Sequence, residues 1–205
     1  MGCHHPKRRT VSRAFHRVPL QACRALSVTC FLACMASALA SQQSTPPEYK
    51  SKANFLATFP SFIEWPETAF SSAEAPFLIC VRGDFSFGTS LAEAARGASS
   101  HGRRVEVRWA RKDQELRNCH IVFVSRSESN RYAKLLRAVE GAGVLTVGET
   151  GDFLAAGGIL TFSFQGETLQ FEVNLPAADT ARLKISSRLL ALARRVLNKT
   201  EAAKS

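Results

Sequence analysis

The sequence predicts an α/β fold: a doubly wound sheet, mostly parallel, with an antiparallel hairpin at one edge and helices from both ends of the domain packed on it. Residues 121–124 and 77–81 are continuous apolar runs, which are typical of strands covered on both faces. Segments with helical spacing alternate with such runs, and this alternation favours parallel strands joined by crossover helices. Residues 160–164 and 169–173 alternate apolar and polar side chains around a turn at 165–167, which predicts the hairpin.

The order of the strands follows from how apolar each one is. Residues 105–109 place apolar side chains only at alternate positions, so this second strand should bury one face and lie at an edge. Residues 77–81 and 121–124 are expected inside the sheet, and residues 144–148 form the fourth strand. These positions predict the flavodoxin-like strand order 2-1-3-4-5.

The first helix is expected over residues 49–65, because Phe55, Phe59 and Phe62 recur at helical spacing. Pro60 disfavours helical geometry at the preceding residue and removes a hydrogen-bond donor. We therefore expect a kink at this point, or two short helices.

The last helix is expected to begin at a Ser186 cap and to carry inward-facing apolar side chains as far as Leu197. Gly88 is expected at the cap of a helix that follows the first strand. The intermediate helices are expected over residues 87–96, in a stretch ending near residue 139, and over residues 152–156.

The beginning of the chain has the pattern of a secretory signal peptide. Residues 1–25 contain six Lys/Arg and no acid, residues 26–40 are apolar apart from small hydroxyl residues, and the segment ends in Ala38-Leu-Ala40. A retained membrane anchor is the alternative, but it needs about 20 apolar residues. The expected organisation is a cleaved signal peptide over residues 1–40, a tether over 41–48, a single domain over 49–199 and a tail over 200–205.

Removal of the leader changes the charge and cysteine content of the chain. The full chain carries +10, but the leader holds six of the 27 Lys/Arg, which leaves 21 against 17 Asp/Glu, or +4. No basic stripe with interleaved aromatic residues remains, which argues against nucleic acid as a partner. Cys80 and Cys119 are the two cysteines left. In an oxidising compartment they either form a disulfide or stay as two buried thiols.

The remaining polar residues do not assemble a catalytic or metal-binding set. His101 and His120 are the histidines outside the leader. His120 adjoins Cys119, so on a strand the two side chains point to opposite faces, which does not suit zinc. Glu149 and Asp152 as general acid and base are the remaining enzyme hypothesis, and helix capping is the preferred explanation for them. We therefore expect no catalysis, no metal and no cofactor.

Two regions are candidate binding sites. The first helix is more apolar than the cover of one sheet face requires. A helix sunk between the sheet and the last helix is the first explanation, and a docking surface for a protein partner is the functional alternative. The residues of this candidate partner-binding surface are Phe59, Phe62, Trp65 and Pro66. Doubly wound sheets bind ligands beyond the carboxyl ends of their strands. That rule selects alternative ligand-binding residues, which are Asp84, Phe87, Ser125 and Glu149.

Several stretches of the chain, in order, carry a resemblance to a known family: residues 49–56, 62–66, 78–84, 87–88, 119–125, 145–148, 171–175 and 183–190. Together they resemble the YfiR family, over nearly all of residues 49–197. None of these stretches is catalytic, and Pro60 departs from the pattern expected at its position.

The resemblance implies a periplasmic protein of Gram-negative bacteria with a Rossmann-like fold and an oxidised Cys80–Cys119 pair. It also implies a role, because YfiR represses a membrane-bound diguanylate cyclase by binding its periplasmic sensor part, and an outer-membrane lipoprotein sequesters YfiR. We therefore expect a non-enzymatic regulator of cyclic-di-GMP synthesis, and hence of biofilm formation. A periplasmic small-ligand sensor module of another signalling system is the alternative, and a homodimer is left open.

Overall fold

The computed structural model describes residue 2 and residues 47–198 of the chain. Apart from residue 2, the expected signal peptide lies outside the described residues, as do most of the expected tether and the expected tail. Among the described residues, no helix combines the length and the apolar character that a bilayer crossing requires.

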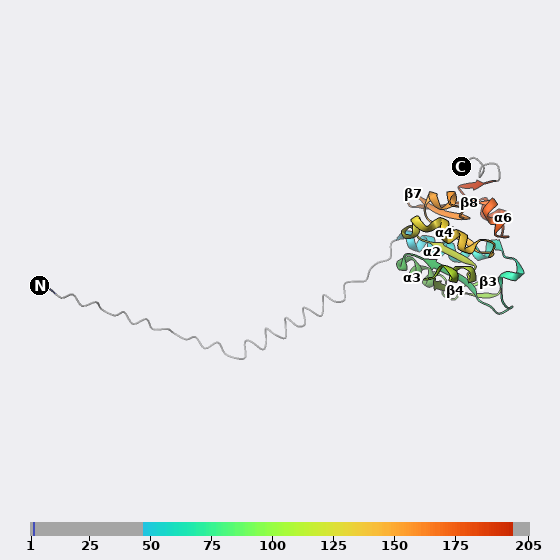
Figure 1. The fold of residues 1–205 in the computed structure, drawn as a ribbon, viewed down its shortest axis with the longest axis horizontal. Helices are drawn as coiled ribbons and strands as arrows, with labels where there is room; N and C mark the ends of the chain where they lie inside the picture. Colours follow the sequence, from blue (N-terminus) through green and yellow to red (C-terminus); the bar gives the residue numbers. More distant parts are fainter. Residues whose placement is uncertain (1, 3–46, 199–205) are drawn as a thin grey trace. The chain divides into compact units, whose positions relative to one another are not determined.

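An eight-stranded sheet forms the centre of the domain (Figure 1), in the order β10-β8-β7-β6-β5-β2-β4-β3. Its strands are β2 (Phe77–Arg82), β3 (Ser99–Ser100), β4 (Arg103–Trp109), β5 (Ile121–Val124), β6 (Leu145–Gly148), β7 (Leu160–Gln165), β8 (Thr168–Asn174) and β10 (Arg195–Leu197). The pairs from β4 through β2, β5 and β6 to β7 are parallel, whereas β7 and β8 form an antiparallel hairpin. The predicted order 2-1-3-4-5, the hairpin and the α/β class are confirmed. The predicted edges differ, because β10 lies outside the hairpin and β3 lies outside β4.

Helices cover both faces of this sheet, and a small separate sheet pairs β1 (Ile63–Glu64) with β9 (Lys184–Ile185). The α-helices are α2 (Pro47–Thr58), α3 (Phe85–Ala94), α4 (Tyr132–Val139), α5 (Gly151–Ala155), α6 (Leu175–Thr180) and α7 (Ser187–Leu190). The 3-10 segments are η1 (Phe59–Phe62), η2 (Glu67–Ala69), η3 (Asp113–Asn118) and η4 (Arg126–Arg131).

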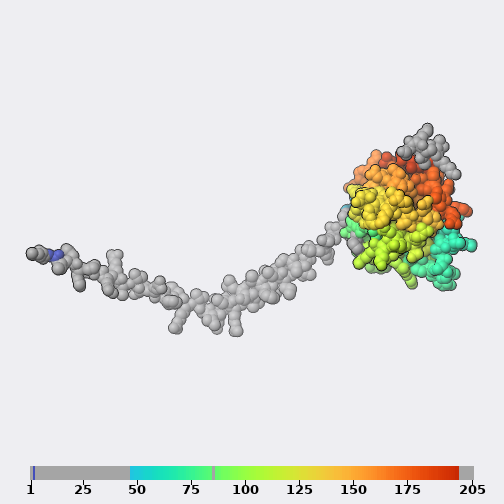
Figure 2. Space-filling view, in the orientation of Figure 1, coloured from blue at the N-terminus to red at the C-terminus, as the bar shows by residue number. Residues whose placement is uncertain are grey.

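The alternation of side chains along β2 divides the core into two layers. Phe77, Ile79 and Val81 pack with buried residues of α2 and α3, whereas Cys80 packs with buried residues of α4 on the opposite face. The space-filling view shows α4, in yellow, on the near surface of the domain (Figure 2). Because both faces are covered, the exposed ends of the strands are the places where a site can form.

The first helix divides at Pro60, as predicted. α2 ends at Thr58, and Pro60 lies in the first turn of η1, after which the chain extends into β1. A proline is tolerated at the start of a helical segment because the amide it lacks would have no partner there. The helix begins at Pro47, two residues before the predicted start.

The prediction of a final helix from Ser186 to Leu197 is wrong beyond its first turn. Ser186 caps α7 through the amide of Leu189, but α7 ends at Leu190. The chain then extends, the amide of Arg194 donates to the carbonyl of Phe171, and β10 pairs with β8. An open edge of the sheet offers backbone partners there, and this tertiary pairing overrides the helical spacing.

The helix after β2 also begins earlier than predicted. Asp84 caps α3 by accepting a hydrogen bond from the amide of Ser86 at 2.7 Å. Gly88 therefore lies inside the helix and is not its cap. A Cβ at Gly88 would come within 2.3 Å of Nε1 of Trp109, so glycine permits the close approach of α3 and β4.

Candidate functional site

The loops that follow β2, β5 and β6 meet at the carboxyl edge of the sheet. The amide of Asp84 donates to Oγ of Ser125 at 3.0 Å, and Oγ of Ser125 lies 2.7 Å from Oγ of Ser127. Gly83 has φ of +104°, and a Cβ there would come within 2.1 Å of Oγ of Ser125. Glycine is therefore required for the β2 and β5 loops to approach each other so closely.

The amino-terminal half of α2 lies across this edge and satisfies its carboxylates. The hydroxyl of Tyr49 donates to Oδ2 of Asp84 at 2.7 Å. The ammonium of Lys52 lies 2.7 Å from Oε2 of Glu149, whose other oxygen accepts from the amide of Arg126 at 2.6 Å. Lys52 is 1% exposed, so its charge is separated from solvent. Three of the four predicted ligand-binding residues, namely Asp84, Ser125 and Glu149, are thus brought together, and α2 covers them.

The protonation of the Tyr49–Asp84 pair follows from its hydrogen bond. The bond to Asp84 and burial raise the pKa of Tyr49 to about 12. Burial acts to raise the pKa of Asp84, but the hydrogen bonds from Tyr49 and Ser86 outweigh it and leave that pKa below its ordinary value. At neutral pH the pair is therefore a phenol donating to a carboxylate.

Phe87, the fourth predicted ligand-binding residue, belongs to the core. Its ring is buried, it stacks on Phe123 with centroids 3.9 Å apart, and it meets the edge of the Tyr49 ring at 5.8 Å. Phe87 packs in the core next to the carboxyl edge and offers no surface to a ligand in this structure.

The residues of the predicted partner-binding surface are placed unequally. Phe59 is fully buried and packs on Phe162 and Phe171, so it forms part of the core. Phe62, Trp65 and Pro66 are partly exposed. Figure 1 shows their segment, in cyan-green, on the rim of the domain. The remaining aromatic surface, defined here as Phe62, Trp65 and Pro66, is smaller than the sequence predicted.

The aromatic surface lies at the amino edge of the sheet, where β2 and β5 begin. The ring of Trp65 meets that of Phe77 at 4.8 Å, and its Nε1 donates to the carbonyl of His120 at 3.3 Å. A cavity of 540 Å³ is present at the same edge, lined by Phe70, Arg108, Arg117 and His120 among others. Open space at this edge therefore lies next to the rings of Phe70 and His120.

His120 is a structural residue of the amino edge. Its Nδ1 accepts from the amide of Leu78 at 2.9 Å, so in the neutral ring Nε2 carries the proton and donates to the carbonyl of Ala69 at 3.1 Å. Burial lowers the pKa of His120, and the charge of Arg103 acts in the same direction. The imidazole is therefore neutral at pH 7.

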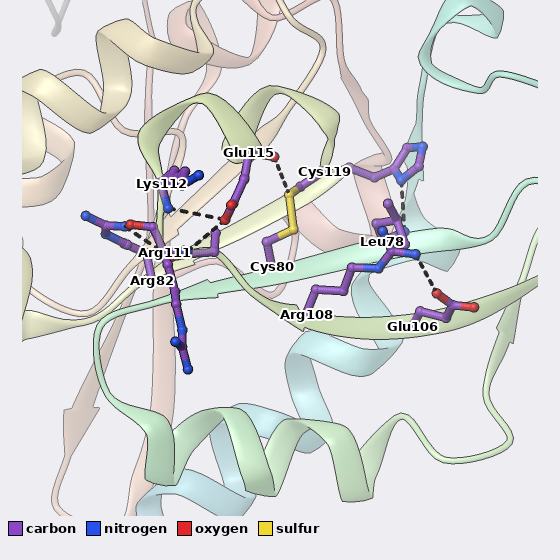
Figure 3. The surroundings of a disulfide bond; sticks show 11 residues. Leu78, Cys80, Arg82, Glu106, Arg108, Arg111, Lys112, Glu115 and Cys119 are labelled. Carbon is purple, nitrogen blue, oxygen red and sulfur yellow. Dashed lines mark hydrogen bonds and ion pairs between the residues drawn. A yellow bond between two sulfur atoms is a disulfide. The ribbon is translucent and has the colours of Figure 1, made fainter.

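A disulfide joins Cys80 of β2 to Cys119, which lies between η3 and β5 (Figure 3). The two Cα atoms are 5.9 Å apart, and both residues are almost fully buried. The pairing that the resemblance implied is therefore present. The bond holds the connection between β4 and β5 against the centre of the sheet.

Sequence reasoning missed one further buried charge, that of Arg82 at the end of β2. Its guanidinium donates to the carbonyls of Ala110 and Arg111, and it forms ion pairs with Asp113 at 3.3 Å and Glu128 at 3.5 Å. These contacts hold the β4–β5 connection in place, as the disulfide does. A basic residue at the end of an apolar run gave no signal of this role.

The part of the chain that the structure describes contains no cluster of three His, Cys, Asp or Glu side chains that could hold a metal ion. Asp152 lies in the first turn of α5, while Glu149 is engaged by Lys52 and Arg126. Asp84, Ser125 and Glu149 are each held in place by another residue of the chain. The chemistry open to these groups is therefore the binding and orientation of a ligand.

The fold and the two edges just described define an α/β domain of the doubly wound class. Within that class, a family model described as YfiR/HmsC-like matches residues 49–194. The chain belongs to the YfiR/HmsC-like family, which is a periplasmic family of regulatory rather than catalytic proteins.

One solved structure shows a similar fold at low sequence identity. A conserved domain protein from Vibrio cholerae is similar with a TM-score of 0.52 and 13% identity, over 75% of this chain and 60% of that chain. This chain thus spans about three fifths of the length of that protein, and the similarity concerns the fold. An ABC domain from Streptococcus pneumonia in complex with L-Trp has a TM-score of 0.45 and 10% identity, over 58% of this chain and 55% of that chain.

Proposed function

We propose that this protein is a periplasmic repressor that binds the periplasmic sensor part of a membrane-bound diguanylate cyclase and lowers cyclic-di-GMP synthesis. The observation that carries the proposal is the YfiR/HmsC-like match across residues 49–194, which is nearly the whole described domain. A repressor of this kind acts by binding one state of the cyclase more tightly than the other.

In this proposal, the signal peptide determines the compartment in which the protein works. Residues 1–40 direct export and are removed after Ala40, residues 41–48 link the cut to the domain over 49–199, and residues 200–205 form the tail. An oxidising compartment is where a disulfide such as Cys80–Cys119 is stable. Both features support a protein that works outside the inner membrane.

The aromatic surface is the proposed contact with the cyclase. Tryptophan beside proline at a partly exposed rim is a favoured anchor in protein interfaces. Trp65 is also fixed by its contacts with Phe77 and His120, so little side-chain freedom would be lost on binding. An outer-membrane lipoprotein that covers the same surface would relieve repression, and a homodimer is a further assembly that the surface permits.

Envelope crosslinking tests the proposal. The full-length protein carrying a photoreactive residue at position 62 is expected to capture a membrane protein with a diguanylate cyclase domain. The same residue at position 104, on exposed Arg104 of β4, is the matched control and should not capture it. Capture from both positions, or from neither, contradicts the proposed surface.

A small-ligand sensor is the second candidate function. The convergence of Asp84, Ser125 and Glu149 beyond the carboxyl ends of the strands favours it, because this is where doubly wound folds bind ligands. A rise of several degrees in melting temperature with one metabolite, without any protein partner, would support this function over repression.

A further inference from the structure

The two halves of α2 are held to the domain by different kinds of contact. In the second half, Ala53 and Leu56 are fully buried, and Phe55 packs on the hairpin. Residues 47–51 bury no apolar side chain completely. The first half is attached through Tyr49 and Lys52, which reach Asp84 and Glu149, and through one ring contact, that of Tyr49 with Phe87. Segments held by few buried apolar contacts open locally at lower cost than core segments.

The ammonium of Lys52 occupies surroundings that suit an organic cation. Carboxylate oxygens of Glu48 and Glu149 lie 2.6 and 2.7 Å away. The rings of Phe164 and Tyr49 have their centroids 5.5 and 5.9 Å from Nζ. Glu149 and Phe164 belong to the body of the domain, whereas Glu48 and Tyr49 lie on α2 together with Lys52. Carboxylates and aromatic faces that surround a desolvated ammonium are the means by which proteins recognise amine ligands.

A buried ion pair of this kind is poorly explained by stability alone. Desolvation of both charges offsets most of their attraction, and buried pairs are best attested as devices that specify register or switching. The Lys52–Glu149 pair fixes where α2 lies. Glu149 also accepts a hydrogen bond from the amide of Arg126, so the position of α2 is coupled to that of the loop after β5. The Tyr49–Asp84 bond does the same for the β2 loop.

We propose that residues 47–52 form an autoinhibitory strap across the carboxyl edge, in which the Lys52 ammonium takes the place of a small primary ammonium ligand. When the strap opens, with the buried second half of α2 as its hinge, Asp84, Glu149 and the hydroxyl of Ser125 face solvent. Two carboxylates at one edge select a cation and repel phosphates and nucleotides.

Amide hydrogen exchange on the full-length chain tests this proposal, with Lys52→Ala as the variant and Lys50→Ala, on the exposed side of the same helix, as the control. In Lys52→Ala, exchange at residues 47–52, 83–86 and 125–127 should rise about tenfold or more, while the β7–β8 hairpin keeps its protection. Millimolar n-butylammonium should reverse the change, and 1-butanol, which has the same chain without the charge, should not.

Lys52→Ala also leaves Glu149 buried without a counter-ion, so this variant can fail to fold. In that event n-butylammonium is expected to restore folding, and failure to do so contradicts the proposal. The double variant Lys52→Met/Glu149→Gln removes both charges. It should fold, exchange rapidly at residues 47–52 and show no response to the amine.

Three results would overturn the strap: slow exchange at residues 47–52 in both variants, uniform loosening of the whole domain, or an equal response to the amine and the alcohol. No cyclase is present in these experiments. A negative result in these experiments therefore does not contradict the proposed repression of the cyclase. Likewise, evidence against repression does not contradict the strap.

Discussion

The two ends of the same sheet differ in how their polar and aromatic groups are satisfied. At the carboxyl edge, Asp84 and Glu149 are engaged by α2, and the loops approach so closely that only glycine fits at position 83. At the amino edge, Trp65 remains partly exposed, and a cavity of about 540 Å³ is lined by Phe70 and His120 among others. One edge is covered by the chain itself, and the other leaves aromatic side chains partly exposed, where we propose that a partner binds.

This difference shows why the position of a site in a fold family does not determine its use. Doubly wound folds bind ligands at the carboxyl edge, but here that edge is covered by a helix that precedes the first strand of the sheet. The surface left available lies at the opposite end. Experiments that disturb each edge separately can therefore separate regulation within the domain from binding to a partner.

The largest expected effect is that of Lys52→Ala on stability. Breaking a buried ion pair by removing one partner costs about 3–5 kcal/mol, because the other charge stays buried without compensation. Lys50→Ala, an exposed change on the same helix, should stay within about 0.5 kcal/mol. Urea unfolding of both variants measures the difference. Equal effects would mean that the carboxyl edge is not held by this pair.

Loss of the disulfide should have the next largest effect. Replacing Cys80 and Cys119 by alanine is expected to lower the free energy of unfolding by about 2–5 kcal/mol, because the unfolded chain loses a constraint across a sequence separation of 39 residues. Hydrogen exchange should increase first in η3 and at the amino edge. An equal increase at residues 47–52 would contradict the separation of the two edges.

Trp65→Ala should weaken partner binding while leaving the carboxyl edge unchanged. An interface anchor of this kind contributes about 2 kcal/mol or more, which is roughly a 30-fold loss of affinity. Trp109→Ala, at the other partly exposed tryptophan, is the control and should bind normally. The measurement is the affinity of the purified protein for the periplasmic part of the cyclase. An equal loss of affinity in both variants would mean that the aromatic surface is not the binding site.

The smallest expected effect is a pH dependence at the amino edge. The folded-state pKa of His120 is lowered, so the unfolded chain binds more protons once the pH falls below about 6.5. The stability that neutral His120 provides is thus complete above that value and declines as the pH falls toward the folded-state pKa.

Between pH 7.5 and 5.5 the loss should be about 1 kcal/mol or less, since one pKa unit corresponds to 1.36 kcal/mol. Urea unfolding at both pH values measures it, and the difference should shrink in His120→Gln. A greater stability at pH 5.5 than at 7.5 would indicate that His120 is charged in the folded state. Asp84 acts in a separate range, because its pKa is lowered from an ordinary value near 3.8.

The sheet was predictable from the sequence because its signals are local. The fully apolar runs of β2 and β5 and the alternation in β4 were sufficient for the order of those strands. The end of the chain was not predictable in this way. Val196 and Leu197 fit a helical stripe, and only the open edge of β8, which is a tertiary feature, draws them into a strand.

The candidate site was predictable only in part. The rule for doubly wound sheets selected Asp84, Ser125 and Glu149 correctly as neighbours, but nothing in the sequence indicated that Tyr49 and Lys52 cover them. A lysine beside other polar residues on a helix is usually solvated. Its burial depends on where α2 lies, and that position is set by the distant apolar contacts of Leu56 and Phe59.

The central claim is repression through the amino edge, and cellular cyclic-di-GMP measures it most directly. Deletion of this protein should raise the cyclic-di-GMP level, and wild-type protein or Trp109→Ala should restore it, whereas Trp65→Ala, produced at an equal level, should not. An unchanged cyclic-di-GMP level after deletion, or full restoration by Trp65→Ala, would contradict the account.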